Sequence, residues 1–403
     1  MEIRKLKTWQ EWLESDRLIA TAFLQDWKEE ESKKQFQAQA EGKEPRTESA
    51  WGAICDDGRM ASTIVTRPQT RIFEGAAVGT GDVNMVGSLP EYRGGGNIRA
   101  LMRAVLGEFR ERGDLFATLH PFSFAFYRKF GFELGARALN QTLPIDQLAP
   151  FTCRYSVRRL ENQTDCDAIR ALYERWILDK SLAALRGDAS WAYRENGEYG
   201  QRNWWLGNRQ EYTYLFSDET GFLRAYLKFA FAEGKEGPMT GTMEVRELIF
   251  DSPEALRNVL GFIYGMRAKV VEVSVSMDED LTLLVPECDR VKQEPEGHTM
   301  VRVLDVPAVL SHLRCQETGA CVIEVADDFL PDNSGVYSLR FGPEGTEVTR
   351  GEAEPDLCVS IQTLSQLVIG RITAKEAALR ADTQVRGNQA APDRLFVRKP
   401  ICL

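Results

Sequence analysis

A run of three glycines has the residue types and spacing to hold a phosphate group. Gly94, Gly95 and Gly96 carry no Cβ to obstruct a ligand, and glycine readily adopts positive φ, so successive backbone amides can point into one concavity. Arg93 adds a permanent positive charge before the run, and Asn97 follows it. The sequence predicts a phosphate-binding turn here, and the alternative interpretation is a flexible surface turn.

The elements predicted around the glycines favour the phosphate site. Residues 83–88 are predicted to form a strand, and after the turn apolar residues recur three or four positions apart, as in a helix packed on a sheet: Ile98, Leu101, Met102, Val105, Leu106 and Phe109. A helix N-terminus offers unpaired N–H groups and a partial positive charge to a diphosphate. The spacing is not G-x-G-x-x-G and no Lys-Ser/Thr follows, which excludes a Rossmann fingerprint and a Walker loop.

The remaining elements must position this turn, and they divide the chain into three mixed α/β parts. The first has a helix, a hairpin and a short strand-helix-strand run, predicted over residues 9–23, 51–66 and 115–132. The second repeats that order of elements, but Asp251-Ser252-Pro253 stands where the first has glycines. The third is predicted as a separate α+β domain. At 403 residues the chain exceeds what one core usually organises, and we expect domains at 1–148, 149–293 and 294–403.

Two motifs in the first part resemble the signatures of the GNAT acetyltransferase superfamily. Residues 91–96, Glu-Tyr-Arg-Gly-Gly-Gly, look like its pyrophosphate-binding signature Q/R-x-x-G-x-G/A, with Glu91 in the first position. Residues 125–133, Ala-Phe-Tyr-Arg-Lys-Phe-Gly-Phe-Glu, are similar to its second signature, a tyrosine-bearing short helix followed by G-F/Y-E. The resemblance implies an N-acetyltransferase that uses acetyl-CoA as its cosubstrate.

The layout of the whole chain narrows the resemblance. A GNAT unit, a second unit without the glycine turn, and a C-terminal domain resembling sterol carrier proteins together look like the enhanced intracellular survival (Eis) family. That family implies an α/β (α+β) fold with tandem GNAT domains. It also implies a small cationic amine substrate, such as an aminoglycoside, a polyamine or lysine, and assembly as a homo-oligomer, a hexamer.

By resemblance, the strand before the turn splays from its neighbour and offers free backbone groups to the pantetheine arm and the thioester oxygen, at Val86 and Ser88. A preorganised donor matters there because negative charge develops on that oxygen, and losing one such donor costs on the order of a hundredfold in rate. Phe122 is expected to complete the cofactor site with the turn residues. For Val86 the alternative is a core strand residue.

Tyr127 corresponds by resemblance to the general acid that protonates the departing thiolate of CoA. With reference pKa values of about 10 for tyrosine and about 8.5 for a thiol, that transfer is uphill by only about 2 kcal/mol. The alternative is a structural tyrosine in an aromatic cluster with neighbouring phenylalanines.

The substrate amine must lose a proton before it attacks. In the Eis family the C-terminal carboxylate serves as the base, which here belongs to Leu403, at the end of an apolar tail. A free α-carboxylate has a pKa of about 3.5 and is ionised at neutral pH. The alternative is a tail packed only for stability. His120 is a candidate proton relay, or a histidine without a catalytic role.

Asp26 and Trp27 are candidates for an acidic and aromatic pocket that binds the amine, although a solvated helix end explains them equally well. The net charge of -10 favours a cationic substrate and argues against nucleic acid.

Composition points to a globular protein of the cytoplasm. Hydrophobic residues make up 43% and charged residues 27%, and no window resembles a signal peptide or a membrane span. The eight cysteines are scattered without a CxxC pair or a histidine cluster, so we expect neither a metal site nor disulfides. The competing hypothesis for function is a non-catalytic scaffold that binds a lipid or a partner through its C-terminal domain.

Overall fold

The computed structural model describes residues 1–403 except 44–45, 201–209, 233–240, 267, 277–279 and 403. These residues fold as two compact units. Unit 1 joins residues 1–135 to residues 299–399, and unit 2 joins residues 136–298 to residues 400–403.

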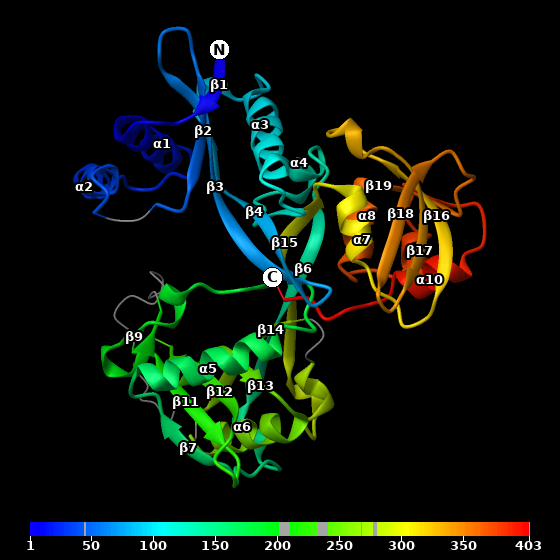
Figure 1. The fold of residues 1–403 in the computed structure, drawn as a ribbon. Helices are drawn as coiled ribbons and strands as arrows, with labels where there is room; N and C mark the ends of the chain where they lie inside the picture. Colours follow the sequence, from blue (N-terminus) through cyan, green and yellow to red (C-terminus); the bar gives the residue numbers. More distant parts are fainter. Residues whose placement is uncertain (44–45, 201–209, 233–240, 267, 277–279, 403) are drawn as a thin grey trace. The chain divides into compact units, whose positions relative to one another are not determined.

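The N-terminal part of unit 1 is a sheet in the order β1-β2-β3-β4-β5-β15. Its strands are β1 (Glu2–Lys5), β2 (Ser49–Ile54), β3 (Met60–Phe73), β4 (Ala76–Ser88), β5 (Phe116–Leu119) and the end of β15 (Lys292–Val303). Its helices are α1 (Trp9–Ala22), α2 (Glu29–Ala40), α3 (Asn97–Glu111) and α4 (Phe124–Arg128). Figure 1 shows α1 and α2 on one side of β2 and β3, and α3 on the other.

The core of this part forms where α3 lies on the sheet. All the apolar residues predicted as its stripe are buried except Ile98, which is partly buried. Gly87 lets α1 approach β4, because a Cβ there would lie 2.9 Å from the side chains of Leu18 and Ile19. The sheet, α1 and α3 therefore hold the end of β4 firmly between two helices.

The C-terminal part of unit 1 has a five-stranded sheet in the order β18-β17-β16-β19-β20. Its strands are β16 (Gly319–Ala326), β17 (Gly335–Gly342), β18 (Gly345–Gly351), β19 (Leu357–Ser360) and β20 (Thr383–Val385). Its helices are α7 (Val306–His312), α8 (Ile361–Val368), α9 (Ala374–Ala377) and α10 (Ala390–Leu395). A fully buried ion pair, Arg302 to Asp327 at 2.6 Å, ties this part to β15.

Unit 2 is built on a run of mixed strands in the order β6-β14-β13-β12-β11-β7. Its strands are β6 (Glu133–Pro144), β7 (Ser156–Arg159), β11 (Tyr212–Ser217), β12 (Leu223–Phe231), β13 (Thr242–Phe250) and β14 (Val270–Ser276), with short strands β8 (Ala183–Ala184), β9 (Tyr193–Arg194) and β10 (Glu198–Tyr199). Its helices are α5 (Gln163–Trp176) and α6 (Pro253–Gly265). As in the N-terminal part of unit 1, one pair of strands is parallel: β13 pairs with β14 from Thr242 to Val245.

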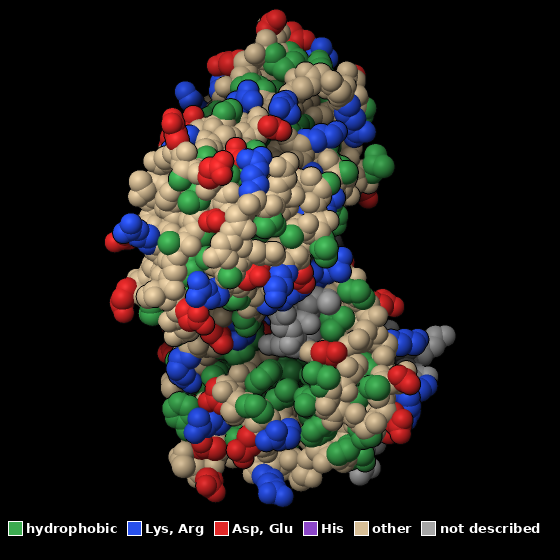
Figure 2. Space-filling model, turned by 90° about the vertical axis from the view of Figure 1, so that its right-hand side faces the viewer, with side chains coloured by type: hydrophobic (Ala, Val, Ile, Leu, Met, Phe, Trp, Pro, Cys, Tyr) green, Lys and Arg blue, Asp and Glu red, His purple; other side chains and the backbone are tan. Residues whose placement is uncertain are grey.

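Two expectations from the sequence needed correction. Strand β3 continues to Phe73, where it turns into β4, well beyond residue 66, at which the predicted hairpin ended. The helix α2 was not predicted from the sequence, and it buries no residue fully. On the face drawn in Figure 2, acidic and basic side chains are interspersed.

Candidate active site

The glycine turn opens directly onto the N-terminus of α3. Gly96 is the N-cap residue with φ 81°, and Gly94 has φ 80°, both in the left-handed region that favours glycine. No side chain caps this helix, and its first internal hydrogen bond runs from Ala100 N–H to the Gly96 carbonyl. The N–H groups of residues 97–99 therefore lack helical acceptors and are available to a ligand.

The space in front of this turn suits a ligand. A Cβ added at Gly94 or at Gly96 would meet no atom within 4 Å. A pocket of about 730 Å³ lies there, and its lining includes these residues predicted from the sequence: Val86, Ser88, Arg93, Gly94, Gly96, Asn97 and Phe122. Gly95 lies in the same turn but does not line the pocket. The structure thus brings nearly all the predicted cofactor residues to one cavity.

The strand before the turn separates from its neighbour. β4 pairs in parallel with β5 from Thr80 to Val83, where β5 ends opposite at Leu119, and β4 then continues to Ser88. On its other side, the register of β4 with β3 shifts between Val83 and Val86, which places a bulge there. The end of β4 therefore lies at the pocket, beyond the last pair that it forms with β5.

Tyr127 lies behind the aromatic wall of this pocket. Its ring is 5.4 Å from that of Phe122 and 5.2 Å from that of Phe126, centroid to centroid, and both of those rings line the cavity. Tyr127 itself is only 3% exposed. This burial raises the pKa of Tyr127 to about 12. His120 is exposed at the end of β5 and does not line the pocket.

Sequence reasoning missed several residues of the pocket wall: Ala22, Phe23, Tyr92, Ile98, Arg99, Phe126, Lys129 and Phe130. A signal was present for Phe126 and Phe130, because they stand close to the predicted Tyr127 and Phe122 in one aromatic-rich segment. Ala22 and Phe23 come from the end of α1, and no local pattern connects them with the turn.

A second pocket, of about 650 Å³, adjoins α1, α2 and the bulge of β4. Asp26 and Trp27 line it, as do Asn84 and Met85 of the bulge. The Trp27 indole N–H donates to Asp16 at 3.0 Å, whereas Asp26 is exposed and forms no ion pair with a described cation. The linker between α1 and α2 thus borders this second pocket, which acidic and basic side chains line together, and, through Phe23, the pocket at the glycine turn.

In unit 2 a side chain caps the corresponding helix N-terminus, that of α6. α6 also follows a strand of the parallel pair, but its N-cap Ser252 accepts a hydrogen bond from Ala255 N–H at 3.2 Å. Pro253 at the first helical position has no N–H to offer. The second helix N-terminus therefore has fewer free donors, and its N-cap side chain already occupies one of them.

The last residues of the chain are anchored within unit 2. Ser181 N–H donates to the Pro400 carbonyl at 2.7 Å, and Cys402 N–H donates to the Ser181 carbonyl at 3.1 Å. Ile401 is 7% exposed. Leu403, the predicted base, lies outside the described residues.

No group of three or more His, Cys, Asp and Glu side chains in the described part of the chain is arranged to hold a metal ion. None of the helices described is both long and apolar enough to cross a membrane.

Comparison with known proteins identifies the domains. Residues 2–135 and residues 183–303 each match the acetyltransferase (GNAT) domain, and residues 306–403 match the sterol carrier protein domain. An uncharacterized N-acetyltransferase of Streptomyces coelicolor is 26% identical over 312 residues, which cover 74% of this chain and 73% of that protein. One from Streptomyces avermitilis is 23% identical over 307 residues, covering 74% of each chain.

Solved structures share the fold over the whole chain. A probable N-acyltransferase from Enterococcus faecalis has a TM-score of 0.82 at 22% identity, covering 99% of this chain and 98% of its own. Eis1 from Mycobacterium abscessus has a TM-score of 0.80 at 21% identity, covering 100% of this chain and 99% of its own. With its two GNAT domains, the chain belongs to the GNAT acetyltransferases and is an enzyme of that class. Its order of domains, ending in a sterol carrier protein domain, is Eis-like.

Proposed function

We propose that this enzyme moves the acetyl group of acetyl-CoA to a primary amine of a small cationic substrate at the pocket beside the glycine turn. The observation that carries the proposal is the N-terminus of α3, which no side chain caps and which opens through Gly94 and Gly96 onto a cavity of about 730 Å³. GNAT acetyltransferases use acetyl-CoA, and the donors present here match its diphosphate.

The cofactor residues divide by the part of the ligand that they would hold. The amides of the turn and of Asn97, with Arg93, would bind the diphosphate. The backbone of Val86 and Ser88 would hold the pantetheine arm and donate to the thioester oxygen. Phe122 would cover the arm. Acetyl-CoA supplies the activated acetyl group.

Tyr127 would donate the proton that the leaving thiolate needs. Its pKa of about 12 keeps the phenol protonated at neutral pH, as a general acid requires. Because the pKa is raised, proton donation to a thiolate of pKa about 8.5 costs about 5 kcal/mol, more than the reference pKa values give. That cost still fits within the barrier of about 13–17 kcal/mol that corresponds to ordinary turnover numbers.

The base in this proposal is the C-terminal carboxylate of Leu403, with His120 as an alternative proton relay. The backbone hydrogen bonds of Pro400 and Cys402 to Ser181 support a docked tail, which such a role requires. An ionised carboxylate would attract the substrate ammonium and accept its proton directly or through water.

The acceptor would bind in the second pocket, where Asp26 and Trp27 offer a carboxylate and an aromatic ring to a cation. An aminoglycoside, a polyamine or lysine has the matching charge. The resemblance also leads us to propose a hexamer and a cytoplasmic location, which light scattering and cell fractionation would test.

The proposal is tested by an assay of CoA release from acetyl-CoA with aminoglycosides, polyamines and lysine peptides as acceptors. We expect turnover with at least one class and none with neutral hydroxyl acceptors. Binding of acetyl-CoA without turnover on any amine would refute the acceptor class. Absence of acetyl-CoA binding would refute the catalytic proposal and favour the scaffold hypothesis.

A further inference from the structure

Three cations beside the cofactor pocket have no carboxylate partner. Arg99 and Arg103 lie one turn apart on α3, Lys129 follows α4, and all three are exposed. None forms an ion pair with any carboxylate that the structure describes, although the chain as a whole has a net charge of -10. We call these three residues the basic rim. An uncompensated positive cluster in an acidic protein indicates an anionic ligand.

A phenylalanine from the sterol carrier protein domain organises the rim. The guanidinium carbons of Arg99 and Arg103 lie 5.2 and 5.3 Å from the centroid of the Phe329 ring, which is within the range of a cation–π contact. Phe329 also packs edge-on against Phe130, with centroids 5.4 Å apart. Both arginines therefore contact the same aromatic ring.

The turn that carries Phe329 is itself fixed. Asp327 accepts hydrogen bonds from the N–H groups of Phe329 and Leu330 at 3.1 and 3.0 Å. Its other oxygen receives Arg302 in the buried ion pair. Because Arg302 is 0% exposed and Asp327 is 2% exposed, the position of Phe329 is tied to the core of unit 1.

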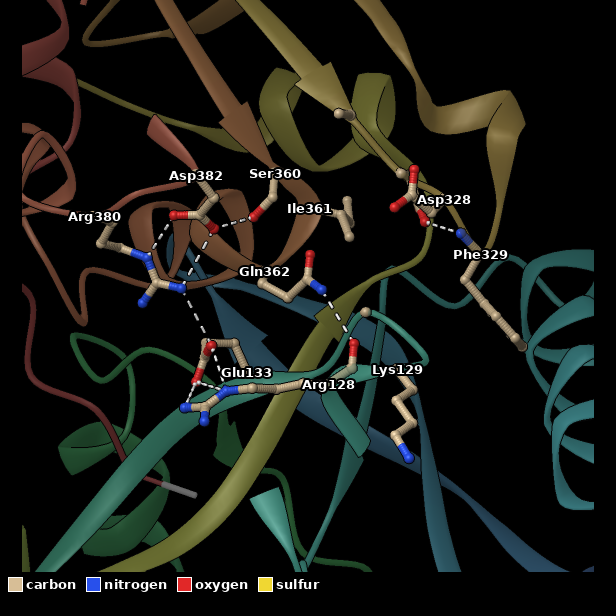
Figure 3. Close-up of a pocket in the computed structure, with 13 residues that line it drawn as sticks. Arg128, Lys129, Glu133, Asp328, Phe329, Ser360, Ile361, Gln362, Arg380 and Asp382 are labelled. Carbon is tan, nitrogen blue, oxygen red and sulfur yellow. Dashed lines mark hydrogen bonds and ion pairs between the residues drawn. The ribbon is translucent and has the colours of Figure 1, made fainter. Parts of the chain in front are cut away.

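Lys129 connects the cofactor pocket with a further cavity. It lines the pocket at the glycine turn and also a cavity of about 410 Å³ to which Phe329 contributes. In that cavity Arg128 is bound by Glu133, and Arg380 is bound by Glu133 and Asp382 (Figure 3). The Lys129 amine lies 5.8 Å from the centroid of the Phe126 ring, and no described carboxylate pairs with it. Among the described basic residues that line this cavity, Lys129 is therefore the one without a carboxylate partner, and it also lines the cofactor pocket; the exposed Asp328 lines the cavity as well.

We propose that the basic rim binds the 3′-phosphate on the adenosine of CoA, so that the sterol carrier protein domain takes part in cofactor recognition through Phe329. This inference rests on the proposed function, which puts the diphosphate at the α3 N-terminus. Arg99 lines the cofactor pocket, and Arg103 and Lys129 extend the positive charge away from the turn. The diphosphate uses the amides of the turn, and the 3′-phosphate is the remaining anionic group of CoA that requires a cationic partner.

The test is isothermal titration calorimetry of the whole chain with CoA and with 3′-dephospho-CoA. We expect the wild-type chain to bind CoA at least about tenfold more tightly than the dephospho form. The double variant Arg99→Gln/Arg103→Gln should lose most of that preference, with dephospho-CoA affinity unchanged. Phe329→Leu keeps an apolar side chain but removes the ring, and it should reduce the preference about threefold.

Two control variants separate this subsite from the diphosphate site. Arg93→Gln should weaken both ligands equally, and Arg340→Gln, an exposed arginine of β17, should weaken neither. Equal wild-type affinity for the two ligands, or an equal loss of both in the double variant, would overturn the 3′-phosphate assignment and leave the proposed function intact. If neither ligand binds the wild-type chain, the proposed function fails as well.

Discussion

Replacing Gly96 by alanine tests whether the left-handed turn holds the cofactor. The added Cβ meets no atom within 4 Å, so no clash is expected, but φ 81° costs an alanine roughly 1–2 kcal/mol. Alanine also restricts the unfolded chain, which offsets about 0.4–1 kcal/mol of that cost. The folded chain should therefore survive, with a melting temperature lower by only about 2–4 °C.

Binding should suffer far more than stability. The methyl group enters the space where the diphosphate is proposed to lie, and relief of the strain would turn amides away from it. A hydrogen bond to a charged group contributes about 1.5–3 kcal/mol, so the loss of one predicts acetyl-CoA affinity about 10- to 100-fold weaker. The assay is calorimetric titration at a temperature well below the melting point.

Gly107 provides the matched control on the same helix. A Cβ there also meets no atom within 4 Å, and Gly107 is not among the glycines with positive φ. Gly107→Ala should stabilise the chain by about 1 kcal/mol and leave acetyl-CoA affinity unchanged. If Gly96→Ala binds acetyl-CoA as tightly as Gly107→Ala does, the reasoning about the turn is wrong.

Three further predictions concern the acid, the base and the first helix. Tyr127→Phe should lower kcat about 100-fold or more and leave acetyl-CoA affinity unchanged. Because the pKa of Tyr127 is about 12, its ionisation should not reduce the kcat of the wild type between pH 8 and pH 10. A kcat of the variant within about threefold of wild type would contradict the role of Tyr127 as general acid. Extending the chain by two residues beyond Leu403 should reduce kcat but not acetyl-CoA binding, and equal turnover would exclude the terminal carboxylate as the base. Burial raises the pKa of Glu11, but the hydrogen bonds from Arg4 and from the N–H groups of Lys7 and Thr8 together outweigh burial and lower this pKa to about 2. The same carboxylate completes the capping box of α1. Because the pKa of Glu11 is depressed in the folded state, its stabilisation is present above the unfolded pKa of about 4.3 and is lost as the pH falls toward 2. Glu11→Gln should therefore lower the free energy of unfolding by about 1–3 kcal/mol at pH 7, and this difference should narrow below pH 4. Equal unfolding curves of the two proteins in urea at pH 7 would contradict this prediction.

Local patterns were sufficient to predict the turn and the helix that follows it. Three glycines, a preceding strand and an apolar stripe all act within about thirty residues, so the sequence contains the whole signal. The same holds for Tyr127, whose short helix and flanking phenylalanines are contiguous. These parts of the candidate site could be predicted because their backbone conformation depends on residues that are close together in the sequence.

The long hairpin and α2 could not be predicted from such patterns. Pro68 is a residue expected to end a strand, yet β3 continues through it to Phe73 and stays in register with β4. α2 shows no apolar stripe because none of its residues is fully buried. In both cases pairing or packing with distant residues determines the structure. The local sequence favours a strand end at Pro68 and gives little indication of the helix α2.

Contacts between distant parts of the chain were also beyond the sequence. Phe329 lies more than two hundred positions from Arg99 and Arg103, and nothing near it in the sequence indicates that its ring supports two arginines. The capped N-terminus of α6 was partly predictable, because Ser252 and Pro253 are standard residues for a helix start. That the N-terminus of α6 offers fewer free N–H donors than the N-terminus of α3 became clear only when the two helices were compared in the structure.

The most direct test of the central claim is a crystal structure of the chain soaked with coenzyme A at millimolar concentration. The account predicts one CoA per chain, with diphosphate oxygens about 3 Å from backbone N–H groups of residues 96–99 and nothing at the Ser252 cap of α6. Coenzyme A bound elsewhere with the groove at Gly94 and Gly96 left vacant, or no bound ligand at all, would contradict it.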